Sequence, residues 1–533
     1  MNDREEGKGM RLLRKGKRGL IQAIFSRLGL IVLLFLLQLA LLLGLFSAAA
    51  EFLPHFFGGT IVFNAIIVIY LLNSEGDPTA KLTWLVFFSV APVFGALFYL
   101  YTKSDIGHRL LRERTTQLIR EGRSDLRAHA SAQQHLEERD PQIARMASYI
   151  AKSGCYPVWE HTAVTYFPLG EDKFAALLPA LRQAKHFIFL EYFIVEEGEM
   201  WGQVLSILVE KVKQGVEVRV LVDGTCEFTH LTHDYPRRMQ ELGIKCKMFA
   251  PVRPFVSTHY NYRDHRKIAV VDGQVAFTGG VNLADEYINR VVRFGHWKDT
   301  AVMLRGEAVR SFTLMFLNMW AIDEHAMEAS RFLAYPTKPV MDAPGFVLPY
   351  SDSPVDGNKV GEQVYIDILS RARRYVHIMT PYLIIDHNME TALQYAAERG
   401  VDVHLILPGI PDKKYAFALA HTHYASLMKA GVKISEYTPG FVHAKVFVAD
   451  DREAVVGTIN LDYRSLYHHF ECAAYMLDVP CIADIEADFQ HTLKQCRRMT
   501  PERLKNDKLS MKVAGALLKA IAPLMLSLIH ISE

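Results

Sequence analysis

One short pattern occurs twice in this chain and constrains its fold more than any other feature. The pattern is a histidine with a lysine two residues later and an aspartate seven residues later. The two copies are His265, Lys267 and Asp272, and His443, Lys445 and Asp450. Each histidine is followed by a glycine after 14 residues, an asparagine after 17 and a leucine after 18: Gly279, Asn282 and Leu283, and Gly457, Asn460 and Leu461. Agreement at so many spaced positions indicates a duplicated unit.

Apolar periodicity around the two motifs predicts an α/β fold. The first copy has helical spacing over 174–185, a strand over 187–194, a helix over 200–214 and a strand over 216–222. The second copy has a helix over 360–372, a strand from 375, a helix that ends at Gly400 and a strand over 401–407. The order strand, helix, strand predicts a parallel sheet with helices on both faces. We therefore expect two equivalent α/β/α halves.

Strand parity separates the three motif residues. Both motifs have a β-like composition, and on a strand His265 and Lys267 point to the same face. Asp272 has the opposite parity and precedes a glycine in a turn, and Asp450 has the same relation to His443. We therefore expect both aspartates to anchor a turn or a neighbouring strand, although they belong to the motif set.

A histidine and a lysine on one face suit chemistry on a phosphate. The lysine supplies positive charge to phosphoryl oxygens, and Asn282 and Asn460 are candidate donors to the same oxygens. A neutral imidazole is a nucleophile near pH 7, and a second, protonated imidazole can give a proton to a leaving alkoxide. Each half has one motif histidine, so we expect the halves to face each other around one active site.

Each histidine also needs an acceptor on its second ring nitrogen. Asp299 and Glu471 follow the two motifs in short β-like segments, and we assign them this orienting role; a solvated carboxylate is the alternative. Metal binding is the main rival for these residues. No His-x3-His or His-Glu-x-x-His accompanies them, and a lysine at i+2 is a poor neighbour for a cation. We expect neither a metal nor a cofactor.

Apolar runs near the start of the chain predict a membrane anchor. They cover residues 28–50, 56–72 and 82–101, with clusters of Lys and Arg before and after them. Lys and Arg mark the cytoplasmic side, so two crossings are favoured, with one run re-entrant or in the interface. The six cysteines form no CxxC pair, which fits reduced thiols facing the cytosol.

These patterns divide the 533 residues into six parts. They are a basic segment (1–27), a membrane anchor (28–102), a helical connector (103–159), the first half (160–335), the second half (336–498) and a C-terminal tail (499–533). The tail is basic and apolar, so an interfacial helix that contacts anionic lipid and a packed terminal helix are both open. The last residues, 527–533, continue no pattern and are set aside.

The segments around both motifs resemble the phospholipase D superfamily, whose members carry two HxKxxxxD motifs, and more closely the bacterial cardiolipin synthases. The likeness covers about residues 160–495 and includes these segments: Asn261–Lys267, Gly279–Asn282, Trp297–Asp299, Thr380–Tyr382, Pro411–Lys413 and Gly457–Ser465. The segments Asn73–Pro78, Lys81–Trp84 and Pro92–Gly95 resemble the membrane anchor of that family. Thr458 stands where a serine is common, which keeps a hydroxyl.

The resemblance implies two pseudo-symmetric phospholipase D-like halves that share one active site, with N-terminal transmembrane helices. It implies the transfer of a phosphatidyl group between two phosphatidylglycerols, which gives cardiolipin and glycerol through a phosphohistidine and without metal. We favour His265 as the nucleophile and His443 as the acid. The implied location is the bacterial plasma membrane, multi-pass, with the catalytic region in the cytoplasm.

Three other functions compete with this one. A phospholipase D that transfers to water, or a transferase that uses another lipid or alcohol, is the alternative enzyme. A nuclease is disfavoured by the membrane runs and by a net charge of only +2. A lipid-binding scaffold without activity is disfavoured because both motifs are intact. The expected partners are phosphatidylglycerol and cardiolipin, with no nucleic acid; the sequence does not determine the oligomeric state.

Overall fold

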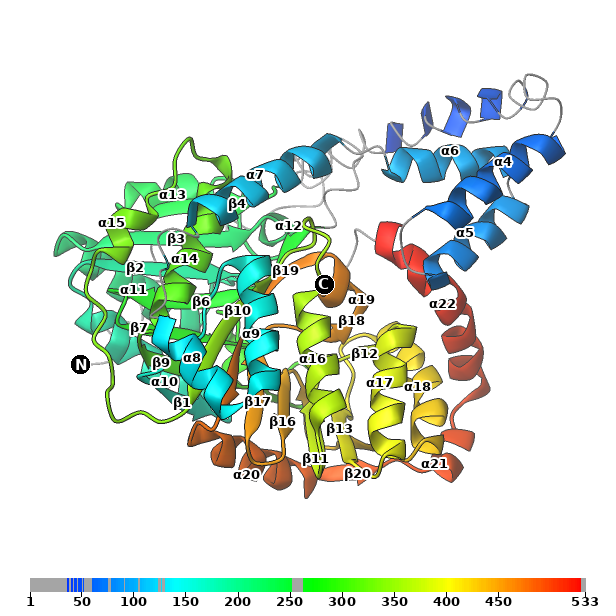
Figure 1. Ribbon diagram of the computed structural model, residues 1–533. Helices are drawn as coiled ribbons and strands as arrows, with labels where there is room; N and C mark the ends of the chain where they lie inside the picture. Colours follow the sequence, from blue (N-terminus) through cyan, green and yellow to red (C-terminus); the bar gives the residue numbers. More distant parts are fainter. Residues whose placement is uncertain are drawn as a thin grey trace.

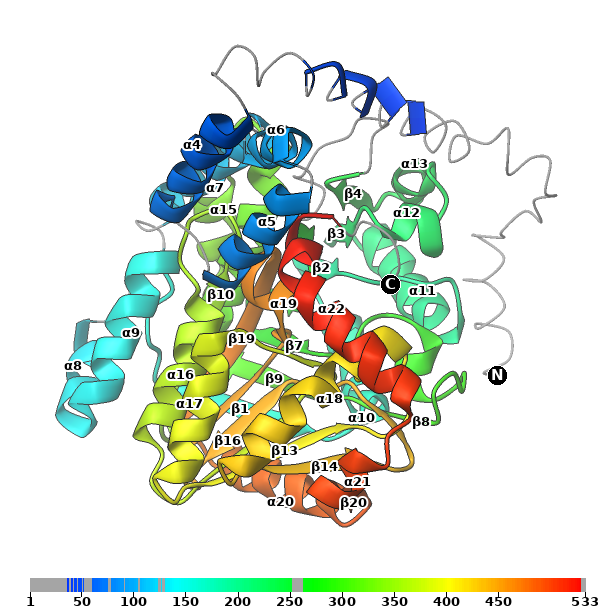
Figure 2. The ribbon, with the colours of Figure 1, turned by 90° about the vertical axis from the view of Figure 1, so that its right-hand side faces the viewer.

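The computed structural model describes isolated positions between residues 36 and 51, and then residues 60–74, 78–90, 92–103, 106–122, 126, 130–251 and 262–528. The basic segment predicted over 1–27, most of the first apolar run, Asn261 and the last five residues lie outside that part. Figures 1 and 2 show a large α/β body, with a group of N-terminal helices that projects from one end of it.

The first half contains a seven-stranded sheet. Its spatial order is β1 (Thr162–Phe167), β9 (Ala301–Gly306), β7 (Val275–Gly279), β6 (Lys267–Val271), β2 (Phe187–Tyr192), β3 (Glu217–Asp223) and β4 (Lys245–Phe249). β2, β3 and β4 run parallel to one another, and every other neighbouring pair is antiparallel. The motif strand β6 therefore lies at the centre of the sheet, next to the parallel strands.

The second half repeats this order strand by strand. It runs β10 (Phe346–Asp352), β19 (His469–Leu477), β17 (Glu453–Gly457), β16 (Val446–Ala449), β11 (Tyr375–Met379), β13 (Asp402–Pro408) and β14 (Lys433–Tyr437), and then adds β20 (Cys496–Arg498). The motif strand β16 occupies the place of β6, and the parallel pairs are again β11–β13 and β13–β14. The expected duplication is confirmed at the level of topology.

The expected parallel pairing holds for the strands joined by a helix, but each sheet as a whole is mixed, and the turn after each motif strand explains why. Asp272 and Gly273 have φ values of 53° and 65°, and Asp450 and Asp451 have 55° and 59°. Two successive residues with positive φ form the tight turn that joins antiparallel neighbours. β6 must therefore return as β7, and β16 as β17. In the two strand orders given above, parallel pairing is confined to strands joined by a crossover helix.

Helices cover the outer faces of both sheets. They are α10 (Gly170–Gln183) and α11 (Glu199–Lys213) in the first half, and α16 (Val360–Arg371) and α17 (His387–Glu398) in the second. Between the halves lie α14 (Val309–Trp320), which contacts β2 and β10, and α20 (Cys481–Leu493), which contacts β1 and β11. Each of these two helices therefore packs on strands of both halves, and one buried apolar cluster joins the halves. The large buried apolar area favours their association.

Other elements surround this body. The predicted connector contains α7 (Ile106–Gly122), α8 (Ala130–Arg139) and α9 (Pro141–Gly154), and α9 packs on β10 and α16. The long helix α18 (Lys414–Lys429) packs against the terminal helix α22 (Leu509–Leu528). The shorter elements are α12 (Cys226–Thr229), α13 (Tyr235–Glu241), α15 (Ala329–Leu333), β12 (Leu383–Ile384), β18 (Leu461–Asp462), α19 (Tyr463–Tyr467) and α21 (Pro501–Lys505).

Three short helices form the described part of the predicted anchor: α4 (Thr60–Asn73), α5 (Pro78–Val90) and α6 (Pro92–Lys103). They share a small core that includes Phe63, Trp84 and Tyr99, and α5 contacts α22. The apolar run 82–101 is divided between α5 and α6, since a proline is favoured at the start of a helix and not inside one. Among the described residues, no helix combines the length and the apolar character needed to cross a bilayer.

Candidate active site

Two small strand pairs connect the halves, and each includes the residues that immediately precede one motif histidine in the chain. β15 (Gly440–Val442) runs parallel to β8 (His296–Lys298), and β5 (Arg263–Asp264) runs parallel to the first residues of β19. The pairing continues into the motifs: the amide of His443 donates to the carbonyl of Lys298 at 2.7 Å, and the amide of His265 donates to that of Phe470 at 3.0 Å. The backbone of each half thus fixes the histidine of the other half.

The same strand pairs between the halves also position the two orienting acids. Nδ1 of His265 lies 2.8 Å from a carboxylate oxygen of Glu471, which belongs to the second half. Nδ1 of His443 lies 2.6 Å from a carboxylate oxygen of Asp299, which belongs to the first half. Both acids are fully buried. When Nδ1–H donates to the carboxylate, Nε2 carries a free lone pair and can act as a nucleophile or base.

The two acids have different neighbours. Thr458, the residue 15 positions after His443, donates its hydroxyl to the carboxylate of Glu471. Gly280 occupies the equivalent position after His265, and a Cβ there would lie only 2.0 Å from an oxygen of Asp299. Asp299 instead accepts from the backbone amide of Thr300 at 2.8 Å. The sites are therefore pseudo-symmetric in backbone and asymmetric in chemistry.

Both motif histidines open into one cavity of about 360 Å³. Six aromatic side chains line it together with polar and charged residues: Phe193, Tyr287, Phe294, Trp297, Tyr382 and Phe441. The ring of Phe193 packs edge-on against His265 at 5.0 Å between centroids, and Tyr287 packs in the same way against His443 at 5.5 Å. Such walls fix the imidazole planes and exclude water from the reacting atoms.

Burial keeps both imidazoles neutral. It lowers the pKa of His265 well below its ordinary value, and the nearby charge of Lys267 lowers it further. Burial and the charge of Lys445 also lower the pKa of His443 to about 4, although the carboxylate of Asp299 opposes this shift. Burial lowers the pKa of Lys445 to about 7. A bound phosphate would reverse these tendencies, since an anion favours the charged forms of both groups.

The motif lysines lie beneath the histidines. Nζ of Lys267 donates to the carbonyl of His265 at 2.5 Å, and Lys445 makes the same contact with the carbonyl of His443. Both ammonium groups are almost completely buried. They therefore supply positive charge at low dielectric next to the cavity, where charge–charge interactions are strong.

The two asparagines line the same cavity with different contacts. Asn282 accepts from the amide of Ile194 at 3.0 Å and donates to the hydroxyl of Tyr287 at 2.7 Å, so its amide fixes the cavity wall. Among the described residues, the side-chain oxygen of Asn460 has no hydrogen-bond partner. The phosphate-binding role of both asparagines stays a prediction.

The motif aspartates lie outside the cavity. Asp272 accepts from the amides of three successive residues, Lys185, His186 and Phe187, at 2.7–2.8 Å. Asp450 accepts in the same way from Arg373, Arg374 and Tyr375 at 2.8–3.0 Å. Neither side chain lines the cavity of the two histidines, and their place among the catalytic residues stays a prediction. They anchor the starts of β2 and β11, which is the role that strand parity predicts.

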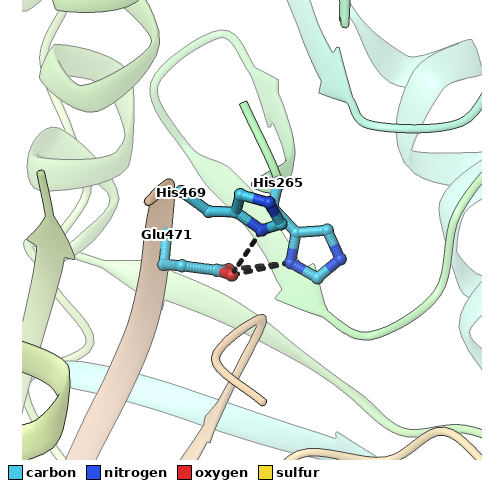
Figure 3. A group of neighbouring side chains, drawn as sticks. All are labelled: His265, His469 and Glu471. Carbon is cyan, nitrogen blue, oxygen red and sulfur yellow. Dashed lines mark hydrogen bonds and ion pairs between the residues drawn. The ribbon is translucent and has the colours of Figure 1, made fainter. Parts of the chain in front are cut away.

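His469 is the residue of this region that sequence reasoning missed. Its ring centroid lies 5.3 Å from that of His265, and its Nδ1 lies 3.6 Å from Glu471 (Figure 3). His469 and Glu471 both belong to β19 and are two positions apart, so they point to the same face of the strand. Strand parity could have identified His469 from the sequence, because a residue two positions from Glu471 on the same strand shares its face.

The sequence matches the family described as cardiolipin synthase, PLD-like domain, over residues 177–320 and 365–493, and each range contains one motif histidine. The chain belongs to the cardiolipin synthase family of phospholipase D-like proteins. This membership makes it a phosphatidyltransferase.

Individual relatives of this family member span most of its length. A Geobacillus protein named cardiolipin synthase is 33% identical over 471 residues, covering 87% of this chain and 92% of that protein. An uncharacterized protein of Streptococcus mutans is 55% identical over 462 residues, covering 86% of this chain and 99% of the relative. The crystal structure of a phosphatidylserine synthase from Haemophilus influenzae aligns with a TM-score of 0.54 and 15% identity, over 73% of this chain and 98% of that one. That likeness supports the two-halved fold.

Proposed function

We propose that this chain is a cardiolipin synthase, which moves the phosphatidyl group of one phosphatidylglycerol onto a second and releases glycerol. The observation that carries the proposal is the pair of buried histidines, one from each half, that open into one cavity with their Nδ1 atoms fixed by crossed carboxylates. Phosphoryl transfer needs an attacking group and a proton donor on opposite sides of phosphorus, and two facing halves supply both. The relatives named cardiolipin synthase add support.

The asymmetry of the acids favours His265 as the nucleophile. Burial disfavours ionisation of both imidazoles, but the charge and hydrogen bond of Asp299 raise the pKa of His443 against that effect. His443 is therefore the better proton carrier, and His265 the better lone-pair donor. Nε2 of His265 attacks phosphorus, the bond from phosphorus to the glycerol oxygen breaks, and His443 gives its proton to that oxygen.

The second step reverses these roles. Neutral His443 takes the proton of a glycerol hydroxyl on the second phosphatidylglycerol, and that oxygen attacks the phosphohistidine. The phosphorus–nitrogen bond breaks, cardiolipin leaves, and His265 is again neutral. Lys267 and Lys445 stabilise the charge on the phosphoryl oxygens in both steps. The aromatic walls favour an alcohol over water as the acceptor, since they limit solvent near the intermediate.

Lipid products test this proposal. Purified protein in detergent is incubated with phosphatidylglycerol alone, and lipids and glycerol are quantified. We expect equal amounts of cardiolipin and glycerol, a loss of at least about 10³-fold in His265→Ala and His443→Ala, and no effect of chelator. Phosphatidic acid as the sole product would show a hydrolase instead. Full activity of His265→Ala would contradict the two-histidine mechanism.

We also place the chain in the bacterial plasma membrane, with the catalytic body on the cytoplasmic side. Exposed apolar side chains on α4 and α5 support this placement, among them Ile61, Ile69, Leu82 and Val86. The basic clusters that flank residues 28–102 support the cytoplasmic side. Protease treatment of spheroplasts tests the orientation: the body should be cut only after the membrane is opened. Cutting in intact spheroplasts would place it outside.

A further inference from the structure

His469 has a buried side chain, and its Nδ1 lies 3.6 Å from a carboxylate oxygen of Glu471, beyond hydrogen-bond distance. Only 3% of its surface is exposed, and neither ring nitrogen makes a hydrogen bond within the described part of the chain. Burying a polar group without a partner costs about 1–3 kcal/mol. The ring of His469 lies next to that of His265, with 5.3 Å between their centroids. Such a nitrogen is expected to have a ligand.

Two further donors converge on the same point. Ligand atoms of His265, His469 and Glu471 all lie within 4.8 Å of one another, and Figure 3 shows the two rings and the carboxylate directed towards a common centre. Two imidazoles and one carboxylate form a donor set that zinc uses in proteins. Zinc bonds of about 2.0–2.2 Å place neighbouring donors about 3.3 Å apart, so modest side-chain rotations suffice.

We propose that His265, His469 and Glu471 form a zinc site that switches the enzyme off. The metal takes Nδ1 of His265, a nitrogen of His469 and an oxygen of Glu471, and it replaces the proton that His265 now shares with Glu471. A neutral imidazole bound to metal through Nδ1 carries its proton on Nε2. The lone pair that attacks phosphorus is then absent. Zinc binding stands on the geometry alone, and only the loss of activity rests on the proposed function.

The other half provides an internal comparison. Trp297 lies two residues before Asp299, where His469 lies two residues before Glu471. Its ring lies 5.4 Å from that of His443, but an indole N–H is a donor only and cannot bind a cation. Within the part of the chain that the structure describes, the geometry therefore gives one zinc site.

Lys267 sets the strength of this site. Its ammonium group lies 5.2 Å from the ring centre of Phe193, which also packs on His265, so it repels a cation bound here. We therefore expect reversible binding in the micromolar range, weaker than a structural zinc site. Magnesium and calcium prefer oxygen ligands, so they should not compete.

Metal binding by the purified full-length protein tests the site directly. After dialysis against chelator, zinc alone is titrated against a chromophoric competitor, and X-ray absorption counts the imidazole ligands. We expect one zinc and two imidazoles in the wild type, and at least tenfold weaker binding in His469→Asn. His468→Asn is the matched control, because His468 precedes β19 and is not among the residues whose ligand atoms converge; it should bind like the wild type.

The second experiment measures how zinc affects transferase activity. Zinc should inhibit the wild type and His468→Asn, chelator should restore activity, and magnesium at equal concentration should have no effect. His469→Asn should keep its activity and need at least tenfold more zinc for inhibition. No binding by the wild type up to about 100 μM zinc, or equal zinc binding by wild type and His469→Asn, overturns the proposal. If the chain has no transferase activity, the zinc titration still tests the zinc site. Failure of the proposed function can therefore be told apart from failure of the zinc proposal.

Discussion

Replacement of Asp299 by asparagine separates the roles of the two histidines. The side chain keeps its size but loses the charge that stabilises protonated His443, and the contact concerned is a buried 2.6 Å hydrogen bond. Hydrogen bonds to charged groups contribute about 1.5–3 kcal/mol, and every 1.4 kcal/mol changes a rate by a factor of ten. We expect kcat for the release of glycerol to fall by about 10- to 150-fold.

The assay compares two leaving groups on the same phosphatidyl group. Glycerol leaves as an alkoxide and needs the proton of His443, whereas p-nitrophenol leaves as a stable phenolate. Asp299→Asn should therefore lose activity with phosphatidylglycerol and remain within about threefold of the wild type with the nitrophenyl ester. The matched variant Glu471→Gln removes the support of the nucleophile and should impair both substrates to a similar degree.

Two outcomes would refute this reasoning. Equal losses for both leaving groups in Asp299→Asn would mean that Asp299 supports the attacking histidine, and the assignment of His265 and His443 would be reversed. Losses smaller than threefold in both variants would mean that the crossed carboxylates do not orient the imidazoles. Circular dichroism melting curves for each variant exclude an effect of unfolding.

Three further predictions concern stability. Asp272→Ala leaves three amide groups at the start of β2 without their acceptor, so urea denaturation should show a free energy of unfolding lower by about 2–4 kcal/mol; a change below about 0.5 kcal/mol contradicts the anchoring role. Gly279→Ala places a Cβ 2.4 Å from the carbonyl of Thr300 at a φ of 143°, so we expect a large fall in Tm or loss of soluble protein, and an unchanged Tm would show that β7 and β9 can separate. Burial lowers the pKa of His404 to about 3, whereas the unfolded chain has about 6.5, so this group's contribution is complete above pH 6.5 and is lost as pH falls towards 3. At pH 5 the loss is about 2 kcal/mol, and His404→Gln should flatten the decline measured by urea denaturation between pH 7 and pH 5.

Local patterns predicted a large share of the fold. The helices and strands predicted before the two motifs follow from the apolar period over a dozen residues, and strand parity predicted that Asp272 is an anchor. The mixed character of each sheet was not predicted, because the helix between β2 and β3 was extrapolated to the whole half. The Asp272-Gly273 pair already carried the opposite signal, since successive residues with positive φ require an antiparallel neighbour.

The sequence by itself identified the side chains to which we assign the chemistry. A repeated histidine and lysine at i and i+2 place both groups on one face of a strand, and this depends only on backbone geometry. The assignment of Asp299 and Glu471 as orienting acids also came from the sequence. The sequence did not show which histidine each acid contacts, because no local rule relates residues that are far apart in the chain.

Tertiary structure decided which acid holds which histidine. Glu471 lies 206 residues from His265 in sequence, and the two meet only because β5 pairs with β19 across the halves. The same pairing brings His469 beside them, and among the described residues its ring nitrogens have no hydrogen-bond partner. The physical reason is the shared core between the sheets. Burial of that core fixes the distance between two halves that, in the sequence, are only copies of each other.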